Sequence, residues 1–99
     1  MYVHPQHGGG AEVKSLRKAG GAWLKQCRLD RGLTQIQVAQ AVGLGSYTMI
    51  SMIEAGRGRI PPESYLLWAA VMALDPREFV KQIMRYYDPV THEILFGAD

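Results

Sequence analysis

The chain has 99 residues, 47% of them hydrophobic and 20% charged, with a formal net charge of +2, which is typical of one globular domain rather than a disordered chain. No stretch approaches the ~20 consecutive apolar residues of a membrane span, and the first residues lack the apolar run of a secretory signal. Because the single cysteine, Cys27, has no partner for an internal disulfide, we expect a soluble, cytoplasmic protein.

The N-terminal third is predicted to hold a flexible arm and one helix. Residues 1–10 contain three consecutive glycines, as is typical of an arm without fixed structure. Apolar residues then recur at helical spacing, but the adjacent Gly20 and Gly21 each cost about 1 kcal/mol relative to alanine inside a helix. We therefore expect the first helix over 22–31, capped by Gly32, and an extension before it that the two glycines interrupt.

Two short helices with a tight turn between them are predicted next. Thr34 is a helix-capping residue, and Gln37 three positions later completes a capping box, so a helix is expected over 35–42. After a turn that contains glycine, Ser46 caps a helix predicted over 47–55, which ends at a further glycine. Because only a few residues separate these helices, we expect them to cross at a steep angle.

The C-terminal part is predicted to add two helices and a tail. Apolar residues recur at helical spacing over 63–73. The Asp-Pro pair at 75–76 combines a cap with a first-turn proline and starts a helix that ends near Tyr87. A second Asp-Pro pair at 88–89 forces a turn, and the apolar residues within 90–96 favour a short strand or an extended packing arm.

Four segments in the middle of the chain have the spacing of a known family. They are Leu33-Thr34-Gln35, Val38-Ala39, Val42-Gly43-Leu44 and Ile50-Ser51-Met52-Ile53-Glu54-Ala55-Gly56. Together they resemble the XRE-type helix-turn-helix, the fold of phage repressors and Cro proteins, over about residues 24–80. The resemblance implies an all-α fold: a five-helix repressor-like helix-turn-helix domain with a short extended C-terminal tail.

The third predicted helix has an apolar and a polar side. Ile50 and Ile53, three residues apart, are expected to anchor the helix to the core. The opposite side is then expected to carry Tyr47, Thr48, Ser51 and Met52. In the family that it resembles, this face enters the major groove of double-stranded DNA, with its first residues nearest the base edges.

The resemblance also implies roles for single residues. Tyr47, Thr48 and Met52 match positions that contact bases, and Gln35 matches a position that bonds a phosphate. Arg28 and Glu54 match a partly buried structural ion pair between the first and third helices. The predicted DNA-binding residues are Gln35, Ser46, Tyr47, Thr48, Ser51, Met52, Arg57 and Arg59.

Two features depart from the family pattern. The turn before the third helix has one residue more than is usual, which we assign to Gly45, so the register of Tyr47 and Thr48 can shift by one position. The predicted DNA-contacting face also lacks Arg, Asn and Gln, the side chains that bond guanine or adenine bidentately. Specificity is therefore expected from single hydrogen bonds, apolar contacts with thymine methyl groups, DNA shape and arginine contacts.

Basic residues are concentrated in the first part of the chain. Residues 1–59 contain eight basic and three acidic residues, whereas residues 60–99 contain three basic and six acidic ones. A polyanion would therefore meet the N-terminal half, although such asymmetry also arises by chance in short chains. Arg57 and Arg59 are alternatively solvated loop charges, and Tyr47 and Met52 alternatively pack on a protein partner.

The chain divides into an arm (1–10), a helix-turn-helix domain (11–87) and a tail (88–99) that is a possible dimerisation arm. This end of the chain has more apolar and aromatic residues than a lone domain needs. The alternative is that the tail folds back onto its own core. The residues predicted to form a dimer interface are Tyr86, Tyr87, Ile94, Leu95 and Phe96.

These patterns predict a sequence-specific transcriptional regulator, a repressor that binds an inverted DNA repeat as a homodimer. An antitoxin or another protein-interaction module, with a regulatory protein as partner, is the alternative, and RNA binding is less favoured. No nucleophile–base pair or phosphate-cradling loop indicates an enzyme, and no cofactor is expected. His4 and His7 have no clustered ligands beside them, so we expect no metal site, and Cys27 is expected to be a buried thiol.

Overall fold

The computed structural model describes residues 6–97, and this part of the chain is helical without a strand. Its elements are α1 (Gln6–Asp30), α2 (Gln35–Ala41), α3 (Thr48–Glu54), the 3-10 turn η1 (Pro62–Ser64), α4 (Tyr65–Val71), α5 (Pro76–Tyr87) and α6 (Pro89–Phe96). The expected all-α domain of five helices is confirmed, and α6 is a sixth helix. No helix within this range is long and apolar enough to cross a bilayer.

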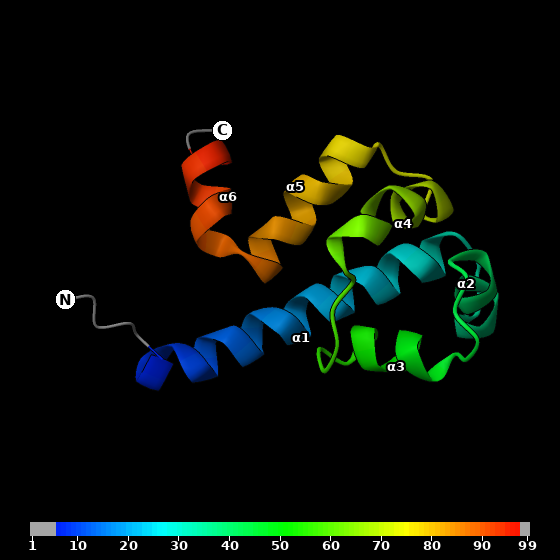
Figure 1. Ribbon diagram of the computed structural model, residues 1–99, viewed down its shortest axis with the longest axis horizontal. Coiled ribbons are helices and arrows are strands. Elements are labelled where there is room, and N and C mark those ends of the chain that lie inside the picture. Colours follow the sequence, from blue (N-terminus) through cyan, green and yellow to red (C-terminus); the bar gives the residue numbers. More distant parts are fainter. Residues whose placement is uncertain (1–5, 98–99) are drawn as a thin grey trace.

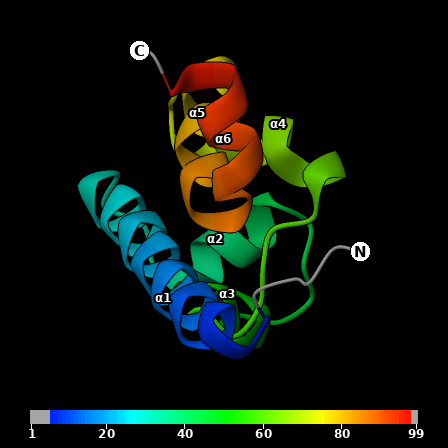
Figure 2. The same cartoon turned by 90° about the vertical axis from the view of Figure 1, so that its left-hand side faces the viewer.

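Helix α1 is the central helix of the fold. It runs between α3 on one side and α5 on the other, and α2 closes the end near its C-terminus (Figure 1). In the rotated view α6 lies beside α5, away from α3 (Figure 2). The pair formed by α2 and α3 therefore lies at one side of the molecule, with its outer surface uncovered by the C-terminal helices.

One core joins the helices. The largest fully buried side chains come from α1, α2, α3, the loop after α3, α4 and α5: Leu24, Val38, Ile50, Ile60, Trp68, Phe79 and Ile83. Three of these helices, α2, α3 and α4, have only seven residues each. Isolated helices of that length are not stable in water, so burial against the common core holds them in place.

The N-terminal region differs from the expected arm and interrupted helix. Residues 6–10 already belong to α1, which continues through both glycines, while residues 1–5 of the expected arm lie outside the described residues. A Cβ atom on Gly20 would lie 2.8 Å from Cβ of Tyr86, and one on Gly21 would lie 2.3 Å from the backbone oxygen of Glu54. The glycines therefore let α5 and α3 approach α1 closely, and this packing offsets their cost within the helix.

The C-terminal tail also differs from the expectation, because residues 89–96 form a helix and not an extended arm. The side chain of Asp88 accepts a hydrogen bond from Thr91 N, and a proline occupies the first turn. The same kind of N-cap starts α5, where the side chain of Asp75 accepts a hydrogen bond from Glu78 N. The turn predicted at the second Asp-Pro pair is therefore the start of a helix, as at the first pair.

The predicted helix ends around α2 are confirmed. Thr34 Oγ1 accepts a hydrogen bond from Gln37 N at 3.1 Å, and Gln37 Oε1 accepts one from Thr34 N at 2.8 Å. Glycines with positive φ end α1, α2 and α3: Gly32 at 70°, Gly43 at 79° and Gly56 at 79°. These caps fix the short connections that set α2 and α3 against each other.

Candidate nucleic-acid interface

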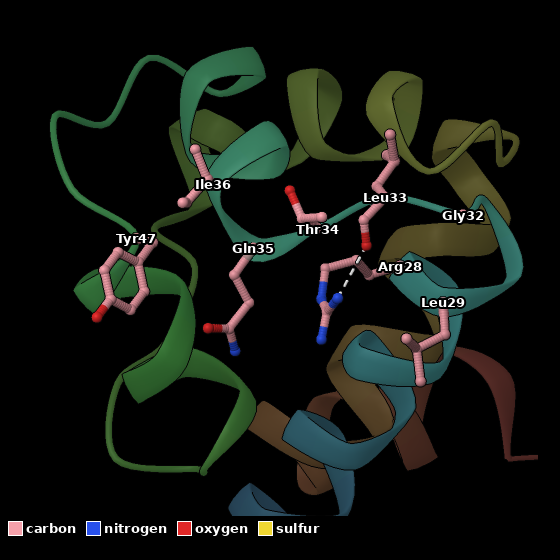
Figure 3. A pocket seen from close by; sticks show the side chains of 8 residues that line it. All are labelled: Arg28, Leu29, Gly32, Leu33, Thr34, Gln35, Ile36 and Tyr47. Atoms are coloured by element: carbon pink, nitrogen blue, oxygen red, sulfur yellow. Dashed lines mark hydrogen bonds between the residues drawn. The ribbon is translucent and has the colours of Figure 1, made fainter.

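Helix α3 is held by apolar anchors and one ion pair. Ile50 and Ile53 are buried in the core. Arg28 Nε donates to Glu54 Oε2 at 2.7 Å and Nη2 donates to Oε1 at 3.1 Å, a bidentate contact between nearly buried side chains. Arg28 Nη1 also donates to Leu33 O at 2.8 Å, as drawn in Figure 3. Because a buried charge without its partner is costly, this pair fixes α3 relative to α1.

The turn before α3 determines where the helix begins. Ser46 Oγ accepts from Thr48 N at 3.1 Å and donates to Thr48 Oγ1 at 3.0 Å. Ser46 thus caps the first helical N–H, but α3 starts at Thr48, one residue later than predicted, and Tyr47 precedes it. The hydroxyl hydrogen of Thr48 is left for another acceptor, because the hydroxyl oxygen serves as the acceptor for Ser46.

The outer face of α3 differs from the expected set of residues. Ser51 Oγ donates to Gln35 Oε1 at 3.2 Å, so Ser51 points to α2 and not outward. At about 100° per residue, Thr48 and Met52 lie opposite the isoleucine anchors. Met49, which the sequence analysis did not single out, is 46% exposed and lies beside Met52, which is 40% exposed. We refer to Thr48, Met49 and Met52 as the outer face of α3.

A hollow lies beside the start of α2 (Figure 3). Its lining residues are Arg28, Leu29, Gly32, Leu33, Thr34, Gln35, Ile36 and Tyr47. Gln35 Nε2 donates to Glu54 Oε1 at 3.0 Å, and since an amide nitrogen carries two protons, this bond leaves a second donor. Ile36 and Tyr47, which are exposed, also line the hollow and lie on the same side of it in Figure 3. The hollow therefore offers an amide donor next to apolar surface.

The two loop arginines have different surroundings. Arg57 lines a groove with Lys14, Lys18, Met52, Ala55 and Gly56, at the end of α3. Arg59 instead lies over the ring of Tyr87, with its Cζ atom 4.7 Å from the ring centroid. Arg17 lies over the same ring, with its Cζ atom 5.6 Å from the centroid. These contacts place Arg57 next to the outer face of α3 and use Arg59 to hold the loop against α5.

Tyr87 joins the loop to the core. Its hydroxyl oxygen accepts a hydrogen bond from Ile60 N at 3.2 Å, and its side chain is buried. Burial raises the pKa of Tyr87 above the ordinary 10.0, although the hydrogen bond from Ile60 and the neighbouring guanidinium groups act in the opposite direction. Tyr87 is therefore part of the interior of its own chain.

The residues predicted for a dimer interface divide into two groups. Tyr86 packs against Trp23, with ring centroids 6.2 Å apart, and Phe96 lies under the ammonium group of Lys81 at 5.1 Å. With Tyr87, these aromatic residues serve contacts within the chain. Ile94 and Leu95 are 76% and 60% exposed, and Val90 one turn earlier is 69% exposed. An apolar face of α6 thus remains at the surface.

Cys27 lines neither the hollow nor the groove. Cys27 is half-buried, and burial, with a smaller effect of Asp30, raises the pKa of its thiol above the ordinary 9.0, which disfavours the reactive thiolate. Among the described residues, no group of three His, Cys, Asp or Glu side chains is placed to hold a metal ion. His4 lies outside the described residues.

Comparison with known proteins supplies one match. A helix-turn-helix family model matches residues 24–79, from the last seven residues of α1 to the first four residues of α5. No curated protein and no solved structure matches the chain. The matched segment is more than half of the 99 residues and contains α2, α3 and the loop with Arg57, but it excludes the N-terminal half of α1 and all of α6.

Proposed function

The chain belongs to the XRE-type helix-turn-helix family of DNA-binding transcription regulators, and from this premise we propose that it is a cytoplasmic, sequence-specific repressor that binds an inverted DNA repeat as a homodimer. The observation that carries the proposal is the placement of α3. Its inner side is anchored by two isoleucines and the Arg28–Glu54 pair, and its outer face is open. An anchored helix with an open outer face is what major-groove binding requires.

The chemistry of the outer face indicates which bases it contacts. The hydroxyl of Thr48 donates one hydrogen bond, and the Tyr47 hydroxyl beside it donates or accepts one. Met49 and Met52 offer apolar, adaptable surface to thymine methyl groups. Since none of these side chains bonds a purine bidentately, we expect half-sites in which thymine contacts and DNA shape dominate.

Selection from a random duplex pool tests this function. We expect the pool to yield an inverted repeat with half-site centres about 10 base pairs apart, or a multiple of that spacing. Enrichment of a single half-site would contradict the homodimer, and the absence of any enriched sequence would contradict sequence-specific binding.

Variants of Arg57 and Arg59 distinguish a phosphate contact from a packing contact within the chain. Replacing Arg57 with alanine should weaken binding to all sequences about equally and reduce the slope of log K against log salt by about 1, because one phosphate contact is lost. Arg59→Ala is the matched control, since Arg59 contacts Tyr87 within the chain. Salt titrations of both variants with a selected duplex measure this, and equal slopes for the two variants would contradict the assignment.

A protein partner is the second candidate function. The exposed side chains of Ile36 and Tyr47, which both line the hollow beside α2, favour it. Such apolar surface suits an antitoxin that grips a toxin. Co-purification of a small protein encoded by a neighbouring gene, lost on Ile36→Asp while DNA binding is retained, would support this candidate. Purification from the native source without a second protein would oppose it.

A further inference from the structure

The N-terminal half of α1 projects from the domain. Helix α1 begins at Gln6, whereas the family match begins at residue 24. In Figure 1 this half of the helix extends past the end of α3, and residues 11–15 are exposed along their whole length. It therefore adds surface next to α3 that the matched segment does not contain.

The end of α3 fixes which residues of α1 lie beside it. A Cβ atom on Gly56 would lie 2.7 Å from Lys18 N and 2.8 Å from the carbonyl carbon of Arg17. The turn after α3 therefore packs directly against the backbone of α1 at these two residues. Lys14 precedes Lys18 by one helical turn, so it shares a face with Lys18 and lies about 6 Å farther from the end of α3.

Three cations share one groove with the outer face of α3. The exposed side chains of Lys14, Lys18 and Arg57 line it together with Met52. Among the described side chains, no ion pair with a carboxylate is found for Lys14, Lys18 or Arg57. The nearest acidic residue along α1, Glu12, is two residues from Lys14 and so lies about 200° around the helix. The groove is thus a positive surface that continues directly from Met52.

We propose that the N-terminal half of α1 is a second DNA-binding element, in which Lys14 and Lys18 bind backbone phosphates that border the groove occupied by α3. This inference rests on the proposed function and extends the bound surface beyond the half-site that α3 contacts. The partner is DNA and not an acidic protein because Met52 belongs both to the groove and to the face that meets the bases. Flexible, exposed ammonium groups suit phosphates, which carry charge without sequence information.

The test compares two variants that lose the same charge. Lys14→Gln with Lys18→Gln removes the proposed contacts and keeps a similar helix propensity. Arg77→Gln with Arg85→Gln removes two exposed cations of α5, on the other side of α1 from α3. Affinity for a random-sequence duplex of about 25 base pairs, and for a selected site, is measured by fluorescence anisotropy between 50 and 200 mM salt, the range over which phosphate contacts have large effects.

We expect the lysine variant to lower the salt slope by about 2 on both duplexes and the arginine variant to leave it unchanged. Lys14→Arg with Lys18→Arg should restore the wild-type slope, which a merely structural effect of the lysines would not predict. Ethylation interference should lose the phosphates at the edge of the site in the lysine variant and keep those within it.

An unchanged salt slope in the lysine variant, or an equal fall in the arginine variant, would overturn this inference. The proposed function would still stand in that case, provided that the wild-type protein binds DNA. Failure of the wild-type protein to bind any duplex would overturn both.

Discussion

Ala73 occupies a position that glycine occupies at three other helix ends. Its φ is 56°, and among the described residues it is the one non-glycine residue with a positive φ. Leu74 N donates to Ala69 O at 2.9 Å, just as Leu44 N donates to Ala39 O at 2.8 Å after Gly43. The same left-handed cap therefore ends α4, but a Cβ atom in this conformation costs about 1–2 kcal/mol.

Replacing Ala73 with glycine should raise the free energy of unfolding by about 0.5–1 kcal/mol, because relief of the left-handed strain exceeds the added entropy of the unfolded chain. Urea unfolding measures the change. Ala70→Gly is the matched control, since Ala70 is exposed within α4 and its replacement should cost about 1 kcal/mol. Equal destabilisation by both substitutions would contradict the role given to the positive φ.

At the scale of elements, α1 is the surface on which α3 and α5 are positioned. Gly21 meets the backbone of α3 at Glu54, and Gly20 meets Tyr86 of α5. The Arg28–Glu54 pair holds α3 against α1 about two turns farther along α1. The distance between α3 and α1, and with it the position of the outer face of α3, thus depends on the absence of a side chain at Gly21.

Gly21→Ala should lower the free energy of unfolding by about 1–3 kcal/mol, because the added Cβ would lie 2.3 Å from the Glu54 oxygen and force α3 away. Gly10→Ala is the control in the same helix, as nothing lies within 4 Å of a Cβ there, and it should stabilise by up to about 1 kcal/mol. Thermal unfolding of both variants measures the difference. If alanine stabilised both positions alike, close approach would not be the reason for Gly21.

At the scale of the molecule, the two ends of the chain extend the domain in different ways. The longest dimension is 46 Å, and α1 lies along it. Helix α6 packs on α5 and presents Val90, Ile94 and Leu95 outward, while Tyr86 and Tyr87 serve the interior. We therefore assign the contact of the proposed homodimer to the exposed face of α6 and not to the tyrosines.

Ile94→Glu with Leu95→Glu should convert the proposed dimer into a monomer, because charges would replace the apolar contact. Sedimentation velocity measures the mass, and binding to an inverted repeat should weaken while binding to a single half-site persists. Leu66→Glu, a similarly exposed position on α4, is the control and should remain dimeric. A dimeric Ile94/Leu95 variant would exclude this face as the interface.

Local signals in the sequence were sufficient for most of the helix boundaries. The Thr34–Gln37 capping box, the glycine at the end of each of the first three helices and the Asp-Pro start of α5 each act within a few residues, so these boundaries can be predicted from the neighbouring sequence. The start of α6 carried the same local signal and was predictable, but the apolar residues after it favoured an extended tail.

The family pattern, the caps and the two isoleucines that anchor α3 could be predicted from the sequence, because they depend on neighbours within one or two helical turns. Packing between distant segments, in contrast, keeps α1 unbroken through Gly20 and Gly21 and turns Ser51 toward α2. It also places Arg57 in one groove with Lys14 and Lys18, and Arg59 over the ring of Tyr87. The physical reason is the same in each case: the partner atoms lie far away in the chain, and no periodicity records how closely two helices approach.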